Sequence, residues 1–312
     1  MDILITGGTG FIGSLLVPTL TGADDDAGRG DRVTLLTREP ERVAARYPEL
    51  IADGRVRLIG HFGEMSRDTR FDAVINLAGE GIADRPWTSQ RKRELHASRV
   101  ALTEALLDWL RLAKHKPEVL ISGSAVGWYG NQGDRLLEED ADARPGFTHQ
   151  LCDDWERTAL TAQTLGMRVC ILRTGVVIGP GGGMLRRMLP VFSLGLGGTL
   201  AGGEQFISWV SLTDVVHVML RMICDREMRG VYNLTAPRPV SNAEFTQILS
   251  RLLRRPAFLR VPETMLKMAM GEMATLLVNG QRVLPSRLLQ AQYHFVHPTL
   301  ESALRAALAK SG

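Results

Sequence analysis

The chain has 312 residues, of which 45% are hydrophobic and 23% charged, so it can bury a sizeable core and wholesale disorder is excluded. The net charge is only +3, and the densest basic cluster (Arg251, Arg254 and Arg255) is interpreted as a solvated face, so nucleic acid is not an expected partner. No segment has the pattern of a signal peptide or a membrane span, and the spacing of Cys152, Cys170 and Cys224 suits neither a disulfide nor a metal. We therefore expect a cytoplasmic protein with no membrane partner and no metal.

The N-terminus carries the most specific pattern. A short apolar run, 3–5, predicts a buried strand that leads into TGGTGFIG and then into apolar residues at helical spacing. In such a unit Gly7 permits a tight turn, Gly10 lets a pyrophosphate approach the backbone, and Gly13 lets the helix pack closely. The pyrophosphate would lie at the helix N-terminus, where free N–H groups and the helix dipole favour negative charge. A glycine-rich turn without a ligand is the alternative. The residues expected to contact a dinucleotide here are Gly7, Thr9, Gly10, Phe11, Ile12 and Gly13.

Strand-type and helix-type runs then alternate through the first half. Strands are predicted over 3–5, 33–36, 56–59, 73–77, 119–122 and 169–172, and helices over 15–20, 91–112 and 149–164. The Gly/Asp-rich segment 22–31 is interpreted as a surface insertion. This alternation predicts a Rossmann-like α/β fold, a doubly wound parallel sheet.

The pattern changes near residue 179, where glycine and proline become frequent. A strand over 205–210, a helix over 214–224 and a strand over 231–234 follow, and the tail from about 241 is mostly helical. We therefore predict a Rossmann core over 1–178, to which 205–235 returns. A smaller C-terminal lobe on the substrate side would comprise 179–204 and 236–312. Such a lobe can cover the carboxyl ends of the strands, where ligands bind in open α/β sheets.

The end of the second strand indicates which dinucleotide is bound. An NAD-preferring site carries an acidic residue there, to accept a hydrogen bond from the ribose 2′-OH. Here Thr37 and Arg38 follow the strand instead. A guanidinium can bind a 2′-phosphate, and the threonine hydroxyl can donate to it. We expect NADP(H) rather than NAD(H); an ordinary surface arginine is the alternative.

Several of these segments resemble the extended short-chain dehydrogenase/reductase (SDR) family. Its G-x-x-G-x-x-G spacing is present in TGGTGFIG, and Asn-Leu-Ala-Gly at 76–79 resembles the N-x-A-G element beside the cofactor. RTGVVIGP at 173–180 resembles the element whose backbone passes under the nicotinamide. The resemblance implies cofactor contacts from Leu77, Ala78, Gly79, Ser122, Gly175, Val176 and Val177. Glu80 and Trp87 are expected to face the substrate, although Glu80 fits a solvated loop equally well.

The catalytic residues of that family are matched only in part. SGSAVGWYG at 122–130 resembles its serine-rich run, and Ser124 matches the serine that bonds the substrate oxygen. The Tyr-x-x-x-Lys pair, in which a tyrosinate of lowered pKa exchanges a proton with the substrate, is missing. Thr148 and Cys152 occupy the two matching positions. His149 and Tyr129 are the alternative proton donors, although a histidine bonded to backbone at the helix start is a slightly better interpretation of His149.

Taken over essentially its whole length, the chain resembles the YfcH-like, epimerase-family group of atypical SDR proteins, including their distinctive C-terminal domain. LRVPETMLKMAMGEMATLLVNGQRVLPSRL at 259–288 carries that part of the resemblance. In the tail, Gln281 and Arg282 could reach a substrate anion or simply flank a helix. Asp214, in a segment that returns the chain to the core, is interpreted as a helix N-cap.

Two functions remain open. The first is an NADP(H)-dependent oxidoreductase or epimerase acting on a small hydroxyl or carbonyl substrate, with Ser124 as the polarising group. The second is a non-catalytic NADP(H)-binding sensor or regulatory module. A pocket lined by Glu80, Trp87, Ser124, Tyr129 and His149 would favour catalysis, and a pocket plugged by apolar side chains of the tail would favour sensing. A homodimer is an additional expectation.

Overall fold

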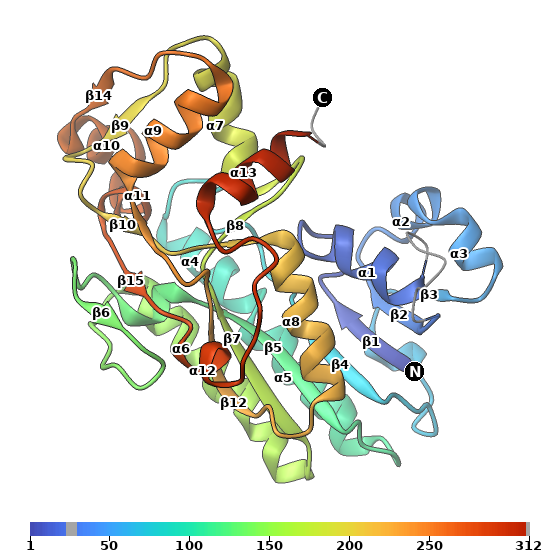
Figure 1. Cartoon of the computed structure of the whole chain (residues 1–312). Helices are drawn as coiled ribbons and strands as arrows, with labels where there is room; N and C mark the ends of the chain where they lie inside the picture. The colour runs from blue at the N-terminus through green and yellow to red at the C-terminus, as the bar shows by residue number, and fades with distance from the viewer. Residues whose placement is uncertain (23–29, 310–312) are drawn as a thin grey trace.

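The computed structural model describes residues 1–22 and 30–309, so most of the surface insertion predicted over 22–31 lies outside the described residues. Seven strands form one parallel sheet in the order β12-β7-β5-β4-β1-β2-β3 (Figure 1). Their bounds are β1 (Asp2–Thr6), β2 (Arg32–Leu36), β3 (Val56–Ile59), β4 (Ala73–Asn76), β5 (Val119–Ala125), β7 (Arg168–Thr174) and β12 (Gly230–Leu234). The order reverses at β1, which confirms the predicted doubly wound, Rossmann-like α/β fold.

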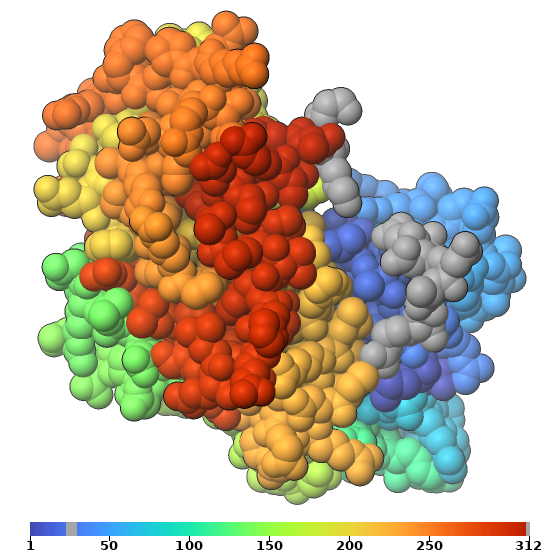
Figure 2. All heavy atoms as spheres, in the orientation of Figure 1, coloured from blue at the N-terminus to red at the C-terminus, as the bar shows by residue number. Residues whose placement is uncertain are grey.

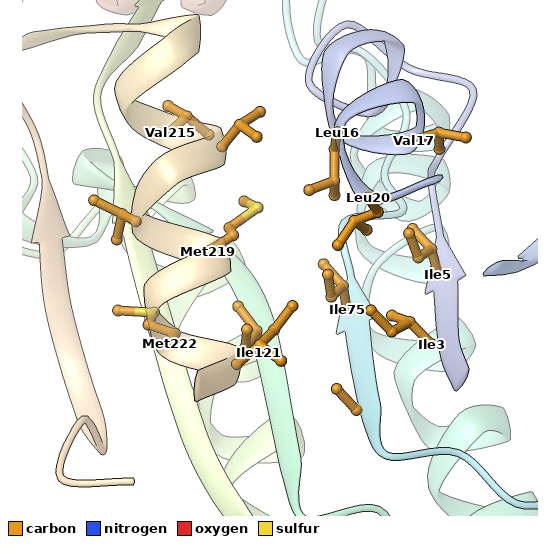
Figure 3. Close-up of a cluster of buried hydrophobic side chains, with 14 of the residues drawn as sticks. Ile3, Ile5, Leu16, Val17, Leu20, Ile75, Ile121, Val215, Met219 and Met222 are labelled. Carbon is orange, nitrogen blue, oxygen red and sulfur yellow. The ribbon is translucent and has the colours of Figure 1, made fainter. Parts of the chain in front are cut away.

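Helices cover both faces of this sheet. Side chains alternate along β1, so that Ile3 and Ile5 face one layer and Leu4 the other. Figure 3 shows Ile3 and Ile5 directed toward the helix pair α1 (Gly13–Thr21) and α8 (Leu212–Cys224). On the opposite face, α5 (Val100–Leu112) and α6 (Phe147–Leu160) pack with Leu4. The shorter elements of this half are α2 (Pro40–Arg46), α3 (Pro48–Ala52), α4 (Ser89–Ala97), η1 (Phe62–Glu64), η2 (Val126–Tyr129), η3 (Thr161–Leu165) and β6 (Leu136–Leu137).

Two predicted elements were wrong in detail. The single helix predicted over 91–112 is two helices, α4 and α5, which break at Ser98 and Arg99. Both of these side chains donate to the carbonyl oxygen of Leu95, which a continuous helix would pair with the N–H of Arg99. The strand predicted over 205–210 is likewise two short strands, β10 (Phe206–Ile207) and β11 (Trp209–Ser211), on either side of Ser208.

A second lobe follows β7 and packs around its own core, which includes Trp209 and Phe245. Its elements are β8 (Val176–Ile178), α7 (Gly183–Ser193), β9 (Gly198–Leu200), β13 (Val240–Ser241), α9 (Asn242–Leu253), β14 (Leu259–Val261), α10 (Glu263–Met270), η4 (Gly271–Ala274), α11 (Thr275–Val278), β15 (Arg282–Val283), α12 (Ser286–Gln290) and α13 (Leu300–Ala309). Between them, β11 pairs with β8, α8 covers the main sheet and β12 joins its edge. Among the residues that the structure describes, no helix has both the length and the apolar character needed to cross a bilayer.

Asp214 connects the tail to the core, and its predicted role as a helix N-cap was wrong. The N-cap of α8 is Ser211, whose side chain accepts from the backbone N–H of Asp214. The fully buried Asp214 carboxylate instead accepts from the backbone N–H groups of Val296 and His297 and from the Tyr293 hydroxyl. Figure 2 shows the C-terminal segment (red) lying along α8 (gold) and against the C-terminal lobe (orange). Asp214 therefore fastens the segment between these two parts.

Candidate functional site

The glycine loop lies at the carboxyl end of β1, close to the carboxyl end of β4. Gly7 has φ +71°, and a Cβ at this position would stand 2.6 Å from the carbonyl carbon of Leu77. A Cβ on Gly13 would stand 2.1 Å from the carbonyl oxygen of Gly8, so the start of α1 packs directly on the loop. Phe11 and Ile12 immediately precede α1, where backbone N–H groups have no helical acceptor. The loop therefore has the backbone shape that a bound pyrophosphate requires.

A buried polar network fixes the strand ends beneath this loop. The Thr6 hydroxyl donates to Asn76 Oδ1 over 2.6 Å, and Asn76 Nδ2 donates to Thr103 Oγ1 over 2.8 Å. Ser122, a predicted cofactor contact, is fully buried, and its Oγ is 3.4 Å from Asn76 Nδ2. The structure therefore places the Ser122 side chain below the site edge. The network joins the ends of β1 and β4 to the middle of β5 and to α5.

Arg38 lies at the end of β2 with its side chain 88% exposed. Its guanidinium is 3.1 Å from the Glu80 carboxylate, which is also 3.2 Å from the buried guanidinium of Arg91. Hydrogen bonds from Arg91 and Arg38 hold the pKa of Glu80 below its ordinary value. Thr37 is buried, and its hydroxyl accepts from the backbone N–H of Glu39. The structure thus brings the side chains of Arg38 and Glu80 together beyond the end of β2, with Arg38 open to solvent.

The carboxyl end of β5 holds a second, closed network. Ser124 Oγ donates to Glu156 Oε1 over 2.5 Å, and the Glu156 carboxylate is bound by Arg173 through two hydrogen bonds of 2.9 Å. Ser124, Glu156 and Arg173 are all buried, with at most 5% exposed. The Arg173 guanidinium stacks on Trp128, 3.4 Å from the ring centroid. The Ser124 hydrogen is therefore already committed to Glu156, so its oxygen can act towards any further group only as an acceptor.

The two alternative proton donors have partners of their own. Tyr129 is fully buried, its hydroxyl donates to Asn233 Oδ1 over 2.7 Å, and burial raises the pKa of Tyr129 above its ordinary value. His149 is half-buried, with Nδ1 2.6 Å from the Trp128 carbonyl oxygen. The structure therefore holds His149 against backbone at the start of α6, and it holds Tyr129 below the site on the side of β12.

The positions that match the family's tyrosine and lysine are also packed. Thr148 lies against Gly127, where a Cβ would be 3.1 Å from the Thr148 Cβ. Cys152 is buried, and burial raises the pKa of its thiol to about 11. Near neutral pH this thiol is uncharged and cannot replace a lysine ammonium.

Trp87 lies under the C-terminal lobe. It packs with Leu95, Leu151 and Met273 in an apolar cluster, and its indole N–H donates to the carbonyl oxygen of Ile82. Two ion pairs also join the lobe to the core: Arg187 to Asp84 over 2.5 Å, and Lys92 to Glu272 over 2.6 Å. The side chain of Trp87 is therefore covered by the tail.

The remaining predicted contacts lie where the chain enters the lobe. Gly175 is packed against the residue before β11, since a Cβ there would stand 2.3 Å from the carbonyl oxygen of Ser208. Val176 and Val177 form β8 and are half-buried. Ser208 also fixes the tail by donating to the carbonyl oxygen of Gln281. Arg282 lies over Phe206, 4.7 Å from the ring centroid.

Comparison with known proteins places these features in a family. The model of the NAD dependent epimerase/dehydratase family matches residues 3–235, and a domain of unknown function, DUF1731, matches residues 261–307. The chain belongs to the NAD-dependent epimerase/dehydratase family. It is an atypical SDR protein with the DUF1731 C-terminal domain, and these matches confirm the resemblance drawn from its motifs.

Relatives match this epimerase-family chain along nearly its whole length. An epimerase family protein of Mycobacterium bovis, Mb2239, is 42% identical over 99% of this chain and 98% of its own. The mouse epimerase family protein SDR39U1 is 34% identical over 99% of this chain and all of its own. A crystal structure of human SDR39U1 (isoform 2) with NADPH has a TM-score of 0.86 and 30% identity, covering 99% of both chains. Solved structures thus include a similar protein with a bound dinucleotide.

Sequence reasoning missed three side chains that the structure places at or beneath the site. Arg173 lies in a segment that resembles a cofactor-contacting backbone element, and no motif in the sequence marks Glu156 or Arg99. Glu156 and Arg173 are 17 residues apart on different elements, so no local spacing indicates their pairing. The sequence offers no signal for Arg99 either, because the helix break at which it lies is visible only in the structure.

Proposed function

We propose that this epimerase-family protein binds NADP(H) and acts as an oxidoreductase or epimerase on a small substrate that carries a hydroxyl or carbonyl group. The observation that carries the proposal is the position of Ser124. This serine is the polar side chain at the carboxyl end of β5, beside the strand ends over which dinucleotides lie in doubly wound sheets. The buried pair of Glu156 and Arg173 holds it in place.

The hydrogen-bonding state of Ser124 favours a hydroxyl as the substrate group. Because Ser124 Oγ donates its hydrogen to Glu156, it can only accept from a ligand in this arrangement. A substrate alcohol can donate to it, whereas a carbonyl oxygen cannot. Polarisation of a carbonyl would require Ser124 to turn away from Glu156.

The exposed guanidinium of Arg38 supports NADP(H) over NAD(H). It has room to leave Glu80 for a 2′-phosphate, which carries more charge than one carboxylate. The bound NADPH in the human SDR39U1 structure is consistent with this preference. The adenine-side geometry therefore supports the cofactor part of the proposal independently of any reaction.

A non-catalytic NADP(H) sensor is the second candidate, and one observation favours it. Trp87, an expected substrate contact, is covered by Met273 from the tail. In a sensor, the cofactor would bind while the space above the nicotinamide stays closed by the lobe. The absence of a tyrosine and a lysine at positions 148 and 152 agrees with this candidate as well.

Turnover separates the two functions. Wild-type protein would be incubated with NADP⁺ and a panel of small alcohols, and with NADPH and the matching carbonyl compounds, while absorbance of the reduced nicotinamide is followed. The oxidoreductase proposal expects turnover of at least one pair, lost in Ser124→Ala while NADPH still binds. Tight NADPH binding with no turnover across the panel supports the sensor.

A further inference from the structure

Arg99 presents a guanidinium that forms no direct ion pair with a carboxylate among the described residues. Its Nη2 donates to the Glu80 carbonyl oxygen over 2.9 Å, and its Nη1 donates to the Leu95 carbonyl oxygen over 3.1 Å and to Ser98 Oγ over 3.3 Å. All three acceptors are neutral. In the described part of the chain, no carboxylate oxygen lies within 4.0 Å of this side chain. Arg91, on the preceding helix, differs because it pairs with both Glu80 and Glu94.

Arg99 lies at the ligand-binding edge of the sheet. A Cβ on Gly79, just beyond β4, would stand 2.9 Å from Arg99 Cζ, so the guanidinium packs directly against that turn. It also lies 5.5 Å from the ring centroid of Trp155 on α6. In a doubly wound sheet, the dinucleotide crosses the point where strand order reverses, with one half on each side. Arg38 follows β2 on one side of β1, whereas Arg99 lies beyond β4 on the other.

The unbalanced charge has an energetic cost that a ligand can offset. Burial lowers the pKa of Arg99, because removing a guanidinium from water disfavours its charged form. The Glu80 carboxylate relieves part of this cost, but it forms its ion pairs with Arg38 and Arg91 and acts on Arg99 only from beyond ion-pair distance. The neighbouring Cys152 is neutral near pH 7, so it neither supplies a negative charge to Arg99 nor a positive charge to a ligand. An anionic ligand would gain the full charge-assisted interaction.

We propose that Arg99 binds the nicotinamide mononucleotide half of the dinucleotide through its phosphate and ribose oxygens. From the start of α5, Arg99 then supplies the positive charge that position 152 on α6 does not. The inference rests on the proposed NADP(H) binding, and it assigns the two halves of the cofactor to two different arginines. Arg38 holds the adenosine 2′-phosphate, and Arg99 holds the opposite half.

Comparison of two ligands tests this assignment without any turnover assay. NADPH contains both halves, whereas adenosine 2′,5′-bisphosphate contains only the half assigned to Arg38. Calorimetric titration of Arg99→Met and Arg99→Gln is expected to show NADPH affinity reduced about tenfold or more. The affinity for adenosine 2′,5′-bisphosphate is expected to stay within about twofold of wild type, a difference of roughly 0.4 kcal/mol. Arg99→Lys should retain part of the NADPH affinity because it keeps the charge.

Arg168 provides a matched control. Its guanidinium also donates to backbone carbonyl oxygens, those of Met222 and Met228, but it lies at the start of β7, the opposite end of the sheet. Arg168→Met should lower thermal stability and leave both affinities unchanged. Arg99→Gln guards against a folding failure of Arg99→Met, since glutamine can still donate to the carbonyl oxygen of Glu80.

The outcomes separate this inference from the function on which it rests. If wild-type protein binds neither ligand, the NADP(H) proposal fails. If wild type binds both and the Arg99 variants lose affinity for both equally, or for neither, the NADP(H) proposal stands and the assignment of Arg99 is overturned. Selective loss of NADPH affinity supports the assignment.

Discussion

Two regions at the carboxyl edge of the sheet differ in the burial and the pairing of their charged side chains. On the β2 side, Arg38 is mostly exposed, and its one ion pair within residues 1–22 and 30–309 joins it to a carboxylate that it shares with Arg91. On the β5 side, Ser124, Glu156 and Arg173 are buried and satisfy one another. An exposed charge can exchange its partner for a ligand at little cost, whereas a buried closed network cannot. The proposed cofactor binding and the proposed substrate chemistry therefore make separate demands on the two regions, and each can be tested alone.

The largest expected effect comes from opening the closed network. Arg173→Met leaves the Glu156 carboxylate buried without its partner, so the free energy of unfolding should fall by about 3–5 kcal/mol. Urea denaturation measures this loss. Arg238→Met is the control, because its pair with Glu244 is exposed and should contribute about 1 kcal/mol or less. Equal losses of unfolding free energy in the two variants would show that the β5 network contributes no more to stability than an exposed ion pair.

The glycine loop offers a test that separates folding from binding. The Cβ of Gly13→Ala would meet the backbone of Gly8 at 2.1 Å, so this variant should lose about 1–3 kcal/mol of stability from overpacking. The Cβ of Gly10→Ala meets only the carbonyl oxygen of Gly7, at 3.2 Å. Gly10→Ala should keep nearly wild-type stability and lose NADPH binding. Thermal denaturation with and without NADPH distinguishes the two, and full NADPH stabilisation of Gly10→Ala would contradict the pyrophosphate site.

On the β2 side, Arg38→Ala should change the preference between NADPH and NADH and leave the free energy of unfolding unchanged. Loss of a charge-assisted contact with the 2′-phosphate should weaken NADPH binding by about 1.5–3 kcal/mol. NADH, which has no 2′-phosphate, should be affected far less. Arg42→Ala is the matched control, since Arg42 is exposed and pairs with Glu39, three residues before it. Equal losses for NADPH and NADH in Arg38→Ala would remove the 2′-phosphate assignment.

The smallest expected effect concerns the Cys152 thiol, beside the buried network at β5. Burial raises the pKa of Cys152 to about 11 from an ordinary value of 9.0, so folding favours the neutral thiol. This contribution to stability is complete below pH 9 and is lost as the pH rises from there toward 11. At mildly alkaline pH, iodoacetamide should modify the exposed Cys224 and leave Cys152 intact, as peptide mass mapping would show. Rapid modification of Cys152 would mean that the β5 side opens readily.

Most of the fold could be predicted because its strands are short apolar runs separated by glycine, proline and polar residues. The run 3–5 and the glycines that follow it indicate a strand, a loop and a helix through local sequence alone. The break between α4 and α5 could not be predicted, since it depends on the side chains of Ser98 and Arg99 competing for a backbone carbonyl. The role of Asp214 was also beyond local sequence, because its partner Val296 is 82 residues away.

The residues of the candidate site also divide into those that local sequence predicts and those that tertiary contacts place. The positions of Gly7 and Arg38 follow from their places beside predicted strands, and the structure puts both at the carboxyl edge. The partners of Ser124, Tyr129 and Trp87 come from α6, β12 and the C-terminal lobe, respectively. Such contacts between distant elements arise only from tertiary packing, and sequence spacing does not record them.

We propose that this epimerase-family protein binds NADP(H) at the edge formed by β1, β2 and β4. Calorimetric titration of the purified wild-type protein with NADPH and with NADH tests it most directly. We predict saturable binding of NADPH, tighter than that of NADH by about tenfold or more, because the 2′-phosphate gains the exposed guanidinium of Arg38. Equal affinity for the two dinucleotides, or binding of neither, would contradict the proposed NADP(H) site.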